Sequence, residues 1–242
     1  MTRNQPHILA FARMSSRRLP GKTLMSLGND VVLGYVVKAL GRVQGSSGLS
    51  VATSVHPTDD AIEEWCRRAG VRCFRGSLDD VTGRALSATA EVKAEAFVRI
   101  SGDSPLIDPA LVDHAIELFL ASECDLVTNV FPRSFPRGQS VEVIRRSALA
   151  VAYSGGLSSS DMEHVTTALY AQPDSYSIVN FAAEDPESSV AGDPVREIDL
   201  AVDELSDLER CRGIVRALHP DQPWTAGWRR CATIGMGLER GL

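Results

Sequence analysis

Short apolar segments alternate with longer segments of helical periodicity through the first 100 residues of the chain. Expected strands cover residues 8–11, 49–53, 71–74 and 96–100, and expected helices cover residues 31–43, 60–69 and 79–93. Parallel neighbours in a sheet need right-handed crossover connections, which usually contain a helix. The alternation therefore predicts an α/β fold with a mostly parallel sheet that helices cover on both faces, a three-layer α/β/α arrangement.

The second half of the sequence is less regular. Helices are expected from residue 145 to Tyr153 and over 109–120, 161–171 and 206–218, and strands over 125–130, 141–144, 177–181 and 196–200. The pairs Ser160 with Glu163 and Ser206 with Glu209 resemble capping boxes. No element is assigned to residues 219–242. We therefore expect one domain over residues 1–218 and a C-terminal tail of unknown role.

Composition excludes several classes of protein. The 242 residues carry a formal net charge of -6, which argues against general nucleic-acid binding because that needs excess Lys and Arg. The five cysteines form no C-x-x-C pair, so neither a disulfide framework nor a zinc site is indicated. No apolar run approaches the ~18 residues of a membrane span. A cytoplasmic protein without nucleic-acid or membrane partners is the expectation.

A cationic loop follows the first expected strand directly. The segment from Ala12 to Leu24 reads A-R-M-S-S-R-R-L-P-G-K-T-L, and its charged and hydroxyl side chains are Arg13, Ser15, Ser16, Arg17, Arg18, Lys22 and Thr23. Ligands of parallel sheets bind beyond the carboxyl ends of the strands, where this loop is expected. Cations and hydroxyls in such a loop are suited to a polyphosphate.

The ending Gly21-Lys22-Thr23 invites comparison with the P-loop of nucleoside triphosphatases. That motif needs a glycine five residues before Gly21, where this sequence has Ser16. Pro20 also removes a backbone donor where the P-loop uses amides to surround phosphate. The P-loop interpretation is therefore rejected, and the choice lies between another phosphate-binding loop and a solvated basic loop.

Two aspartates are expected near the same edge of the sheet. Asp103 follows the fourth expected strand in S-G-D-S-P, and Asp203 ends the segment A-V-D before the helix at Ser206. Two carboxylates beside a triphosphate suit Mg²⁺, which takes few protein carboxylates together with phosphates and water. The structural alternatives are a turn residue for Asp103 and a favourable charge near a helix N-terminus for Asp203.

Several segments, in order, resemble one family. They are A-R-M-S-S-R-R-L-P-G-K at 12–22, V-A-T-S at 51–54, R-G-S-L-D-D-V-T-G-R at 75–84, R-I-S-G-D-S-P-L-I-D at 99–108, P-R-G at 136–138, E-H-V-T at 163–166 and V-D at 202–203. Together they resemble the cytidylyltransferases that make CMP-activated sugars, which include the acylneuraminate and Kdo enzymes and, most similar of all, the SpsF-like spore-coat polysaccharide branch. The resemblance covers nearly the whole chain to about Leu218.

The resemblance implies a nucleotide-diphospho-sugar transferase (Rossmann-like) fold, CTP as cosubstrate, Mg²⁺ as metal and a homodimer. It implies that Arg18 and Lys22 assist the leaving pyrophosphate, and that Asp103 and Asp203 bind the metal. The implied nucleotide-binding residues are Ala12, Arg13, Ser15, Ser16, Thr53, Arg75, Gly76, Ser77 and Gly102. The implied acceptor-binding residues are Arg137, Glu142, Glu163 and His164, within an acceptor and dimerisation subregion over residues 132–175.

The implied reaction transfers CMP from CTP to an anionic acceptor, which is a sugar acid, a sugar phosphate or a phosphonate, and releases pyrophosphate. Four positions depart from the family pattern, namely Ser15, Ser140, Met162 and Asp199. The last three lie in or beside the acceptor half, which predicts an unusual acceptor such as a phosphonate or a modified sugar phosphate. Ser15 replaces a glycine of the phosphate loop, and this favours the alternative hypothesis, a CTP-binding module that has lost turnover.

Overall fold

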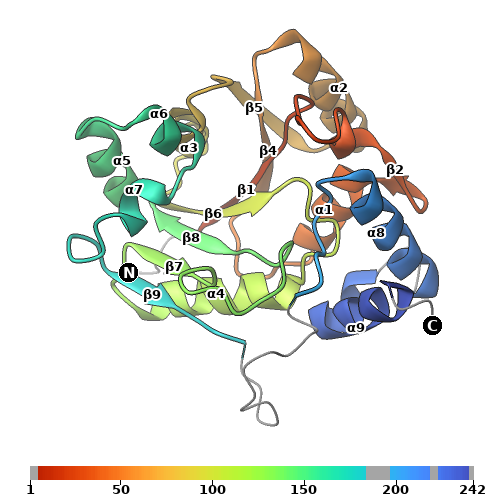
Figure 1. Cartoon of the computed structure of the whole chain (residues 1–242). Coiled ribbons are helices and arrows are strands. Elements are labelled where there is room, and N and C mark those ends of the chain that lie inside the picture. The colour runs from red at the N-terminus through yellow and green to blue at the C-terminus, as the bar shows by residue number, and fades with distance from the viewer. Residues whose placement is uncertain (1–4, 184–196, 219–222, 240–242) are drawn as a thin grey trace.

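The computed structural model describes residues 5–183, 197–218 and 223–239. Its main sheet has seven strands in the order β5 (Arg72–Gly76), β4 (Leu49–Ser54), β1 (His7–Phe11), β6 (Ala96–Ser101), β8 (Glu142–Arg145), β7 (Leu126–Thr128) and β9 (Ile178–Asn180). Strand β8 runs antiparallel to both of its neighbours, and the other pairs are parallel. The predicted mostly parallel α/β sheet is confirmed (Figure 1).

Alternate residues of the strands face opposite layers, as the period of two requires. Ile8 and Ala10 pack in one apolar cluster with helices α1 (Val32–Leu40), α2 (Asp60–Ala69), α4 (Pro109–Ala121), α8 (Leu205–Ala217) and α9 (Gly227–Glu239). Leu9 packs in a second cluster with α3 (Val81–Glu91), α5 (Arg146–Ser154) and α7 (Thr167–Tyr170). The three-layer α/β/α arrangement is therefore confirmed.

The expected helix over residues 161–171 was wrong as a single element. The structure has a short helix α6 (Ser159–Glu163), and α7 begins only at Thr167. The chain leaves the helical region at His164, with φ −114° and ψ 81°, so that Val165 enters the core. The sequence pattern is compatible with one continuous helix, but the break at His164 allows Val165 to be buried.

Both capping boxes lie two residues before the expected positions. Ser158 with Asp161 caps α6, and Glu204 with Asp207 caps α8. In each box a side chain accepts from the backbone N–H three residues ahead, and the later acid accepts from the cap's own N–H. Several polar residues at each helix start offer this chemistry, so the sequence pattern did not fix which pair is used.

Three further elements differ from the sequence-based expectations. The short hairpin of β2 (Ser26–Leu27) and β3 (Asp30–Val31) was not expected, and it turns at Gly28, whose φ is +53°. The strand expected over residues 196–200 does not form over residues 197–200, which belong to no strand of the sheet. Residue 196 lies outside the described residues.

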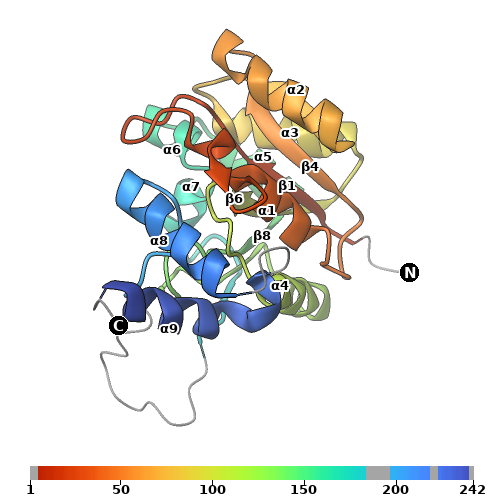
Figure 2. The same ribbon diagram turned by 90° about the vertical axis from the view of Figure 1, so that its right-hand side faces the viewer.

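The C-terminal segment, left unassigned by the sequence, folds into the 3₁₀ turn η4 (Pro223–Ala226) and helix α9 (Figure 2). Trp224 packs edge-on against Tyr35 with ring centroids 6.0 Å apart, and Trp228 packs against Phe135 at 5.3 Å. The backbone N–H of Trp228 donates to Asp108 Oδ2 at 3.1 Å, and the same carboxylate caps α4. The segment therefore belongs to the same apolar core as the sheet.

No helix in the described part of the chain combines the length and the apolar character that a bilayer crossing requires.

Candidate active site

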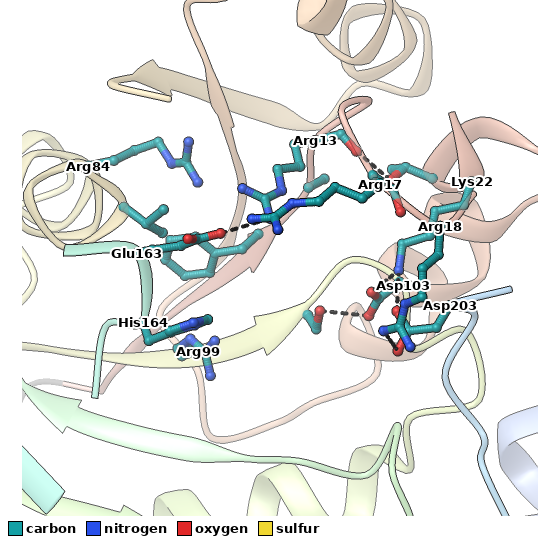
Figure 3. A pocket seen from close by; sticks show the side chains of 16 residues that line it. Arg13, Arg17, Arg18, Lys22, Arg84, Arg99, Asp103, Glu163, His164 and Asp203 are labelled. Carbon is teal, nitrogen blue, oxygen red and sulfur yellow. Dashed lines mark hydrogen bonds and ion pairs between the residues drawn. The ribbon is translucent and has the colours of Figure 1, made fainter. Parts of the chain in front are cut away.

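A cavity of about 540 Å³ opens above the carboxyl ends of β1 and β6 (Figure 3). Its wall consists of Phe11, Ala12, Arg13, Ser16, Arg17, Arg18, Lys22, Thr23, Val81, Arg84, Arg99, Ser101, Asp103, Glu163, His164 and Asp203. Six of these residues are basic and three are acidic, in a chain whose net charge is -6. The cavity therefore has a local excess of positive charge, at the edge of the sheet where parallel folds bind ligands.

A buried carboxylate anchors the cationic loop to the sheet. Asp59, which has no exposed surface and ends the 3₁₀ turn η2 (Pro57–Asp59), accepts from the Met14 N–H at 2.7 Å. Its second oxygen accepts from the N–H and the hydroxyl of Ser54 at the end of β4. Charge-assisted bonds to a fully buried carboxylate are among the stronger ones in proteins. Asp59 thus fixes the start of the loop.

The loop then folds back on itself. The Gly21 N–H donates to the Met14 carbonyl at 2.9 Å, and the Thr23 hydroxyl donates to the Arg13 carbonyl at 3.1 Å. Gly21 has a φ of +76°, a conformation that glycine adopts without a steric penalty. This turn leads into the 3₁₀ turn η1 (Lys22–Leu24), so Lys22 is directed into the cavity.

The Lys22 ammonium joins the two predicted metal ligands. Its Nζ donates to Asp103 Oδ2 at 2.5 Å and to Asp203 Oδ1 at 2.7 Å. The Lys22 side chain is only 9% exposed, so this contact is largely shielded from water. The sequence predicted that the two aspartates converge, and the structure brings both to one point.

Backbone contacts explain why the two aspartates converge. The Val202 N–H donates to the Asp103 carbonyl at 2.8 Å. Asp203, the next residue after Val202, therefore lies beside Asp103. The Gly102 N–H donates to the Phe11 carbonyl at 2.7 Å, and a Cβ at position 102 would lie 2.7 Å from that carbonyl oxygen. Only glycine permits this approach, so the requirement at Gly102 is the close contact between β1 and the β6 loop.

Asp203 receives three cations. Besides Lys22, Arg18 Nη2 lies 2.7 Å and Arg137 Nη2 lies 2.6 Å from Asp203 Oδ2. Partial burial would raise the pKa of Asp203, but the Lys22 hydrogen bond and the three nearby charges outweigh burial and lower that pKa. Asp203 is therefore held ionised, as a metal-binding carboxylate must be.

On the other side of the cavity, Arg13 pairs with Glu163. Arg13 Nη2 lies 3.1 Å from Glu163 Oε1, and this hydrogen bond is the main cause of the lowered pKa of Glu163. The pair joins the cationic loop to the segment that the sequence assigned to the acceptor. His164 follows on the same wall of the cavity and is exposed.

Several predicted site residues lie outside the cavity wall. Arg75 pairs with Asp60 and Glu63 at 2.6 Å each. Thr53 is fully buried, and its Oγ1 has no hydrogen-bond partner in the described residues. The remaining residues outside the wall are Ser15, Gly76, Ser77, Gly102, Arg137 and Glu142.

Glu142 and Arg137 contact wall residues instead. Glu142 is buried and pairs with Arg99 at 2.5 Å, while Arg137 pairs with Asp203. The predicted site residues in the wall are Ala12, Arg13, Ser16, Arg18, Lys22, Asp103, Glu163, His164 and Asp203. The structure therefore brings together all the residues predicted for the metal and for catalysis.

Three charged residues outside the cationic loop contribute to the site although sequence reasoning did not assign them to it. Asp59 anchors the loop, and Arg84 and Arg99 supply cations from α3 and β6. Arg84 and Arg99 end and begin two of the motifs that resemble the family, but their burial and direction depend on tertiary packing. Asp59 follows β4 within five residues, and its acidic character alone gave no signal of complete burial.

The two aspartates fit a divalent cation in one specific way. No group of three or more His, Cys, Asp or Glu side chains is placed to hold a metal ion in residues 5–183, 197–218 and 223–239. In these parts of the chain a cation at Asp103 and Asp203 would therefore have no third His, Cys, Asp or Glu ligand from the protein. Mg²⁺ is bound in this way, through one or two carboxylates, substrate phosphates and water.

The mostly parallel, three-layer sheet with a cationic cavity beyond its strand ends is a Rossmann-like architecture, and the similarity of the whole chain to cytidylyltransferases makes it a nucleotidyltransferase. Residues 8–212 match the family model described as cytidylyltransferase, and the chain belongs to that family.

Known proteins agree with this assignment. The chain is 33% identical over 175 residues to the spore coat polysaccharide biosynthesis protein SpsF of Bacillus subtilis, covering 69% of this chain and 70% of that protein. The structure of a cytidylyltransferase from Leptospira borgpetersenii is similar with a TM-score of 0.81 and 28% identity, over 89% of this chain and 88% of that one. A CMP:2-keto-3-deoxy-manno-octonic acid synthetase complexed with CTP shares the fold, with a TM-score of 0.64 and 18% identity over 88% and 99% of the two chains.

Proposed function

We propose that this cytidylyltransferase transfers CMP from CTP to an anionic small molecule and releases pyrophosphate. The observation that carries the proposal is the placement of Lys22 between Asp103 and Asp203, beside the arginines of one loop. This arrangement provides cations for a triphosphate and carboxylates for its divalent counter-ion in the same cavity. The CTP bound in the related synthetase supports CTP as the nucleotide.

In the proposed reaction an acceptor oxygen attacks the α-phosphorus of CTP, and the bond from that phosphorus to the bridging oxygen of pyrophosphate breaks. Phosphoryl transfer depends on alignment and on neutralising charge more than on a nucleophilic side chain. Arg18 and Lys22 would bind the leaving pyrophosphate, and Asp103 and Asp203 would hold Mg²⁺, which when bound would neutralise charge at the phosphate. A phosphate or phosphonate oxygen attacks already deprotonated and needs no general base, whereas an attacking sugar hydroxyl must give up its proton to a base.

The backbone at Ser15 bears on the alternative function, an inactive CTP-binding module. Glycine in a phosphate loop is required where φ is positive. Lys93 is the one non-glycine residue with positive φ in the described residues, so Ser15 adopts an ordinary conformation. Its side chain is exposed. The backbone of the loop therefore accommodates a serine at position 15, so its conformation gives no reason to prefer the inactive module.

We also propose that the enzyme is a homodimer that uses part of residues 132–175. Val151 and Tyr153 of this segment are exposed, and neighbouring Phe131 is exposed while stacking on Tyr170. Light scattering after size exclusion is expected to give twice the chain mass of 26.1 kDa. A single-chain mass at high protein concentration contradicts the dimer.

Pyrophosphate release tests the proposed reaction. The enzyme is incubated with each of the four nucleoside triphosphates, Mg²⁺ and a library of sugar acids, sugar phosphates and phosphonates. Release that depends on CTP and on one acceptor class is expected. The Asp103→Asn variant is expected to lose turnover and keep its fold, because an amide oxygen is a poorer ligand for a hard cation. Binding of CTP without turnover on any acceptor favours the inactive module.

A further inference from the structure

Arg75 lies near the end of the edge strand β5, and its side chain binds the connection between β4 and α2. Nε donates to the Ser54 carbonyl at 2.9 Å, and Nη2 donates to the His56 carbonyl at 3.2 Å. Nη1 donates to Glu63 and Nη2 to Asp60, at 2.6 Å each. A guanidinium has five N–H donors, so these four bonds leave Arg75 little capacity to bind a ligand.

The four acceptors of Arg75 lie on both sides of Asp59 along the chain. Two of them precede Asp59 and two follow it. Residues 55–58, which connect β4 to Asp59, are all exposed, and Val55 is 63% exposed. Apolar packing therefore contributes little to the position of this connection, and polar contacts such as those of Arg75 determine where Asp59 lies.

Asp59 connects this segment to the cationic loop. Its buried carboxylate accepts from the Met14 N–H at 2.7 Å. The Met14 carbonyl accepts in turn from the Gly21 N–H at 2.9 Å, at the turn that directs Lys22 into the cavity. A continuous series of hydrogen-bonded groups therefore runs from Arg75, through the segment that holds Asp59, to the loop that carries the cations.

We propose that Arg75 is a positioning residue for nucleotide transfer, which sets the geometry of the cationic loop through Asp59 and does not itself contact the nucleotide. The inference rests on the proposed function, because it requires the loop to bind the phosphates of CTP. Arg75 lies outside the cavity wall, and its bonds to protein acceptors support the indirect role. Transfer at phosphorus depends on alignment, so a small displacement of the loop lowers both affinity and turnover.

Lysine cannot replace arginine in this role. The planar guanidinium reaches acceptors on opposite sides of Asp59 from three different nitrogen atoms. An ammonium has all three of its donors on one atom and cannot span the same acceptors. Arg75→Lys is therefore expected to behave like Arg75→Met, whereas a residue that contributed only its charge to the phosphates would keep part of its effect as lysine.

Calorimetric titration of the full chain with CTP and with CMP, each with Mg²⁺ and without acceptor, tests this assignment. Arg75→Met and Arg75→Lys are each expected to weaken CTP binding by about tenfold or more. The loss for CMP is expected to be much smaller, because CMP lacks the two outer phosphates that the loop binds. Arg72→Met is the control, since Arg72 is an exposed arginine of the same strand that pairs with Glu91, and it is expected to change neither affinity.

A double-mutant cycle tests whether Arg75 acts through Asp59. Asp59→Asn alone is expected to weaken CTP binding, because the loop loses part of its anchor. Arg75→Met added to Asp59→Asn is then expected to cause a further loss of less than about twofold, since the residue through which Arg75 acts is already impaired. Losses that multiply, as they do for independent residues, contradict the proposal.

The remaining outcomes separate the possible failures. Equal losses for CTP and CMP would assign Arg75 to the nucleoside and overturn the indirect role, and so would wild-type CTP affinity in Arg75→Met. Circular dichroism and urea denaturation check that each variant is folded, and Arg75→Lys carries the test if Arg75→Met does not fold. Failure of the wild-type enzyme to bind CTP contradicts the proposed function itself, whereas unchanged affinities in the Arg75 variants contradict only this inference.

Discussion

Lys22 Nζ lies 2.5 Å from Asp103 Oδ2, within the pair of carboxylates that we propose as the metal site. The same ammonium contacts Asp203 at 2.7 Å. Without nucleotide, an internal cation therefore neutralises the carboxylates that Mg²⁺ needs. A triphosphate offers Lys22 a competing partner, so nucleotide binding and metal binding are expected to favour each other.

Lys22→Met is predicted to strengthen the binding of divalent cations to the nucleotide-free protein. Removal of the ammonium leaves two adjacent carboxylates without their shared counter-charge, which raises their affinity for another cation. Titration with Mn²⁺, followed by electron paramagnetic resonance, measures this affinity without turnover. The variant is also expected to lose about 100-fold or more in turnover, since it lacks a cation at the leaving phosphates.

Lys38→Met is the control for this prediction, because Lys38 is exposed and pairs with Asp30 away from the cavity. Its Mn²⁺ affinity is expected to equal that of the wild-type protein. Equal or weaker Mn²⁺ binding by Lys22→Met would show that the ammonium does not compete with the metal.

Asp59→Asn is predicted to weaken CTP binding although Asp59 lies outside the cavity wall. The amide presents its NH₂ group to one set of backbone donors, so either Met14 or Ser54 loses its acceptor. A stability loss of about 1–3 kcal/mol is expected for an unsatisfied buried donor. Urea denaturation and CTP titration measure the two effects. Glu117→Gln, an exposed change on α4, is expected to have neither effect.

Gly138→Ala is predicted to disturb the site through Arg137. Gly138 has a φ of +88°, and a Cβ there would lie 2.5 Å from the Leu200 carbonyl carbon. The clash pushes the loop away from Leu200, whose N–H donates to the Arg137 carbonyl, and so displaces the Arg137 contact to Asp203. We expect loss of thermal stability together with lower turnover.

Gly70→Ala separates the backbone penalty of a positive φ from the steric clash with Leu200. Gly70 also has a positive φ, +68°, but a Cβ at this position would have no atom within 4 Å, so only the backbone penalty of about 1–2 kcal/mol applies. Its turnover is expected to stay at the wild-type value. If both variants lose the same stability, the contact with Leu200 contributes nothing.

His7 is predicted to make the unfolding free energy of the protein fall at acidic pH. Burial, with a smaller contribution from Arg72, lowers the pKa of His7, and its Nε2 lies 2.8 Å from Ser50 Oγ. Below about pH 6.5 the unfolded chain binds a proton that the folded chain does not, so stability falls with pH until the lowered folded pKa is passed. Above about pH 6.5 His7 is neutral in both the folded and the unfolded chain, so it does not make the unfolding free energy depend on pH.

Urea denaturation of His7→Gln measures this contribution. The difference in unfolding free energy between about pH 7.5 and pH 5.5 is expected to be smaller than in the wild-type protein. His56→Gln, at an exposed histidine, should keep the wild-type difference. An unchanged difference in His7→Gln removes His7 as a source of acid sensitivity.

The sequence predicted the first half of the fold well because its signals are local. The alternation of apolar strands and helices up to Ser101 depends on periodicity and on turn residues such as Gly70, which caps α2 with φ +68°. In the second half, tertiary contacts decide. Leu200 is buried without joining the sheet, and the C-terminal segment folds where Trp224 of η4 and Trp228 of α9 pack into the larger apolar cluster.

The candidate site divides in the same way. Lys22 and Asp103 could be predicted because their motifs follow β1 and β6, whose ends meet at one edge of the sheet. Asp203 was found from its family motif, although the strand expected before it does not form over residues 197–200. Arg84 could not be predicted, since an arginine on a helix is usually exposed and its burial follows from the glycine opposite it. The role of Asp59 depends on a backbone N–H in another loop, which no spacing in the sequence reveals.

The contact between Lys22 and Asp203 also has a consequence for synthesis of the protein, because 181 positions separate the two residues along the chain. A nascent chain that has exposed β1, β4, β5 and β6 can place Lys22 against Asp103 but has no second carboxylate. Lys22 gains its second carboxylate only after Asp203 has left the ribosome and the segment before α8 has packed beside Arg137. A chain released before Asp203 would lack one of the two proposed metal ligands and also helices α8 and α9, which complete the larger apolar cluster.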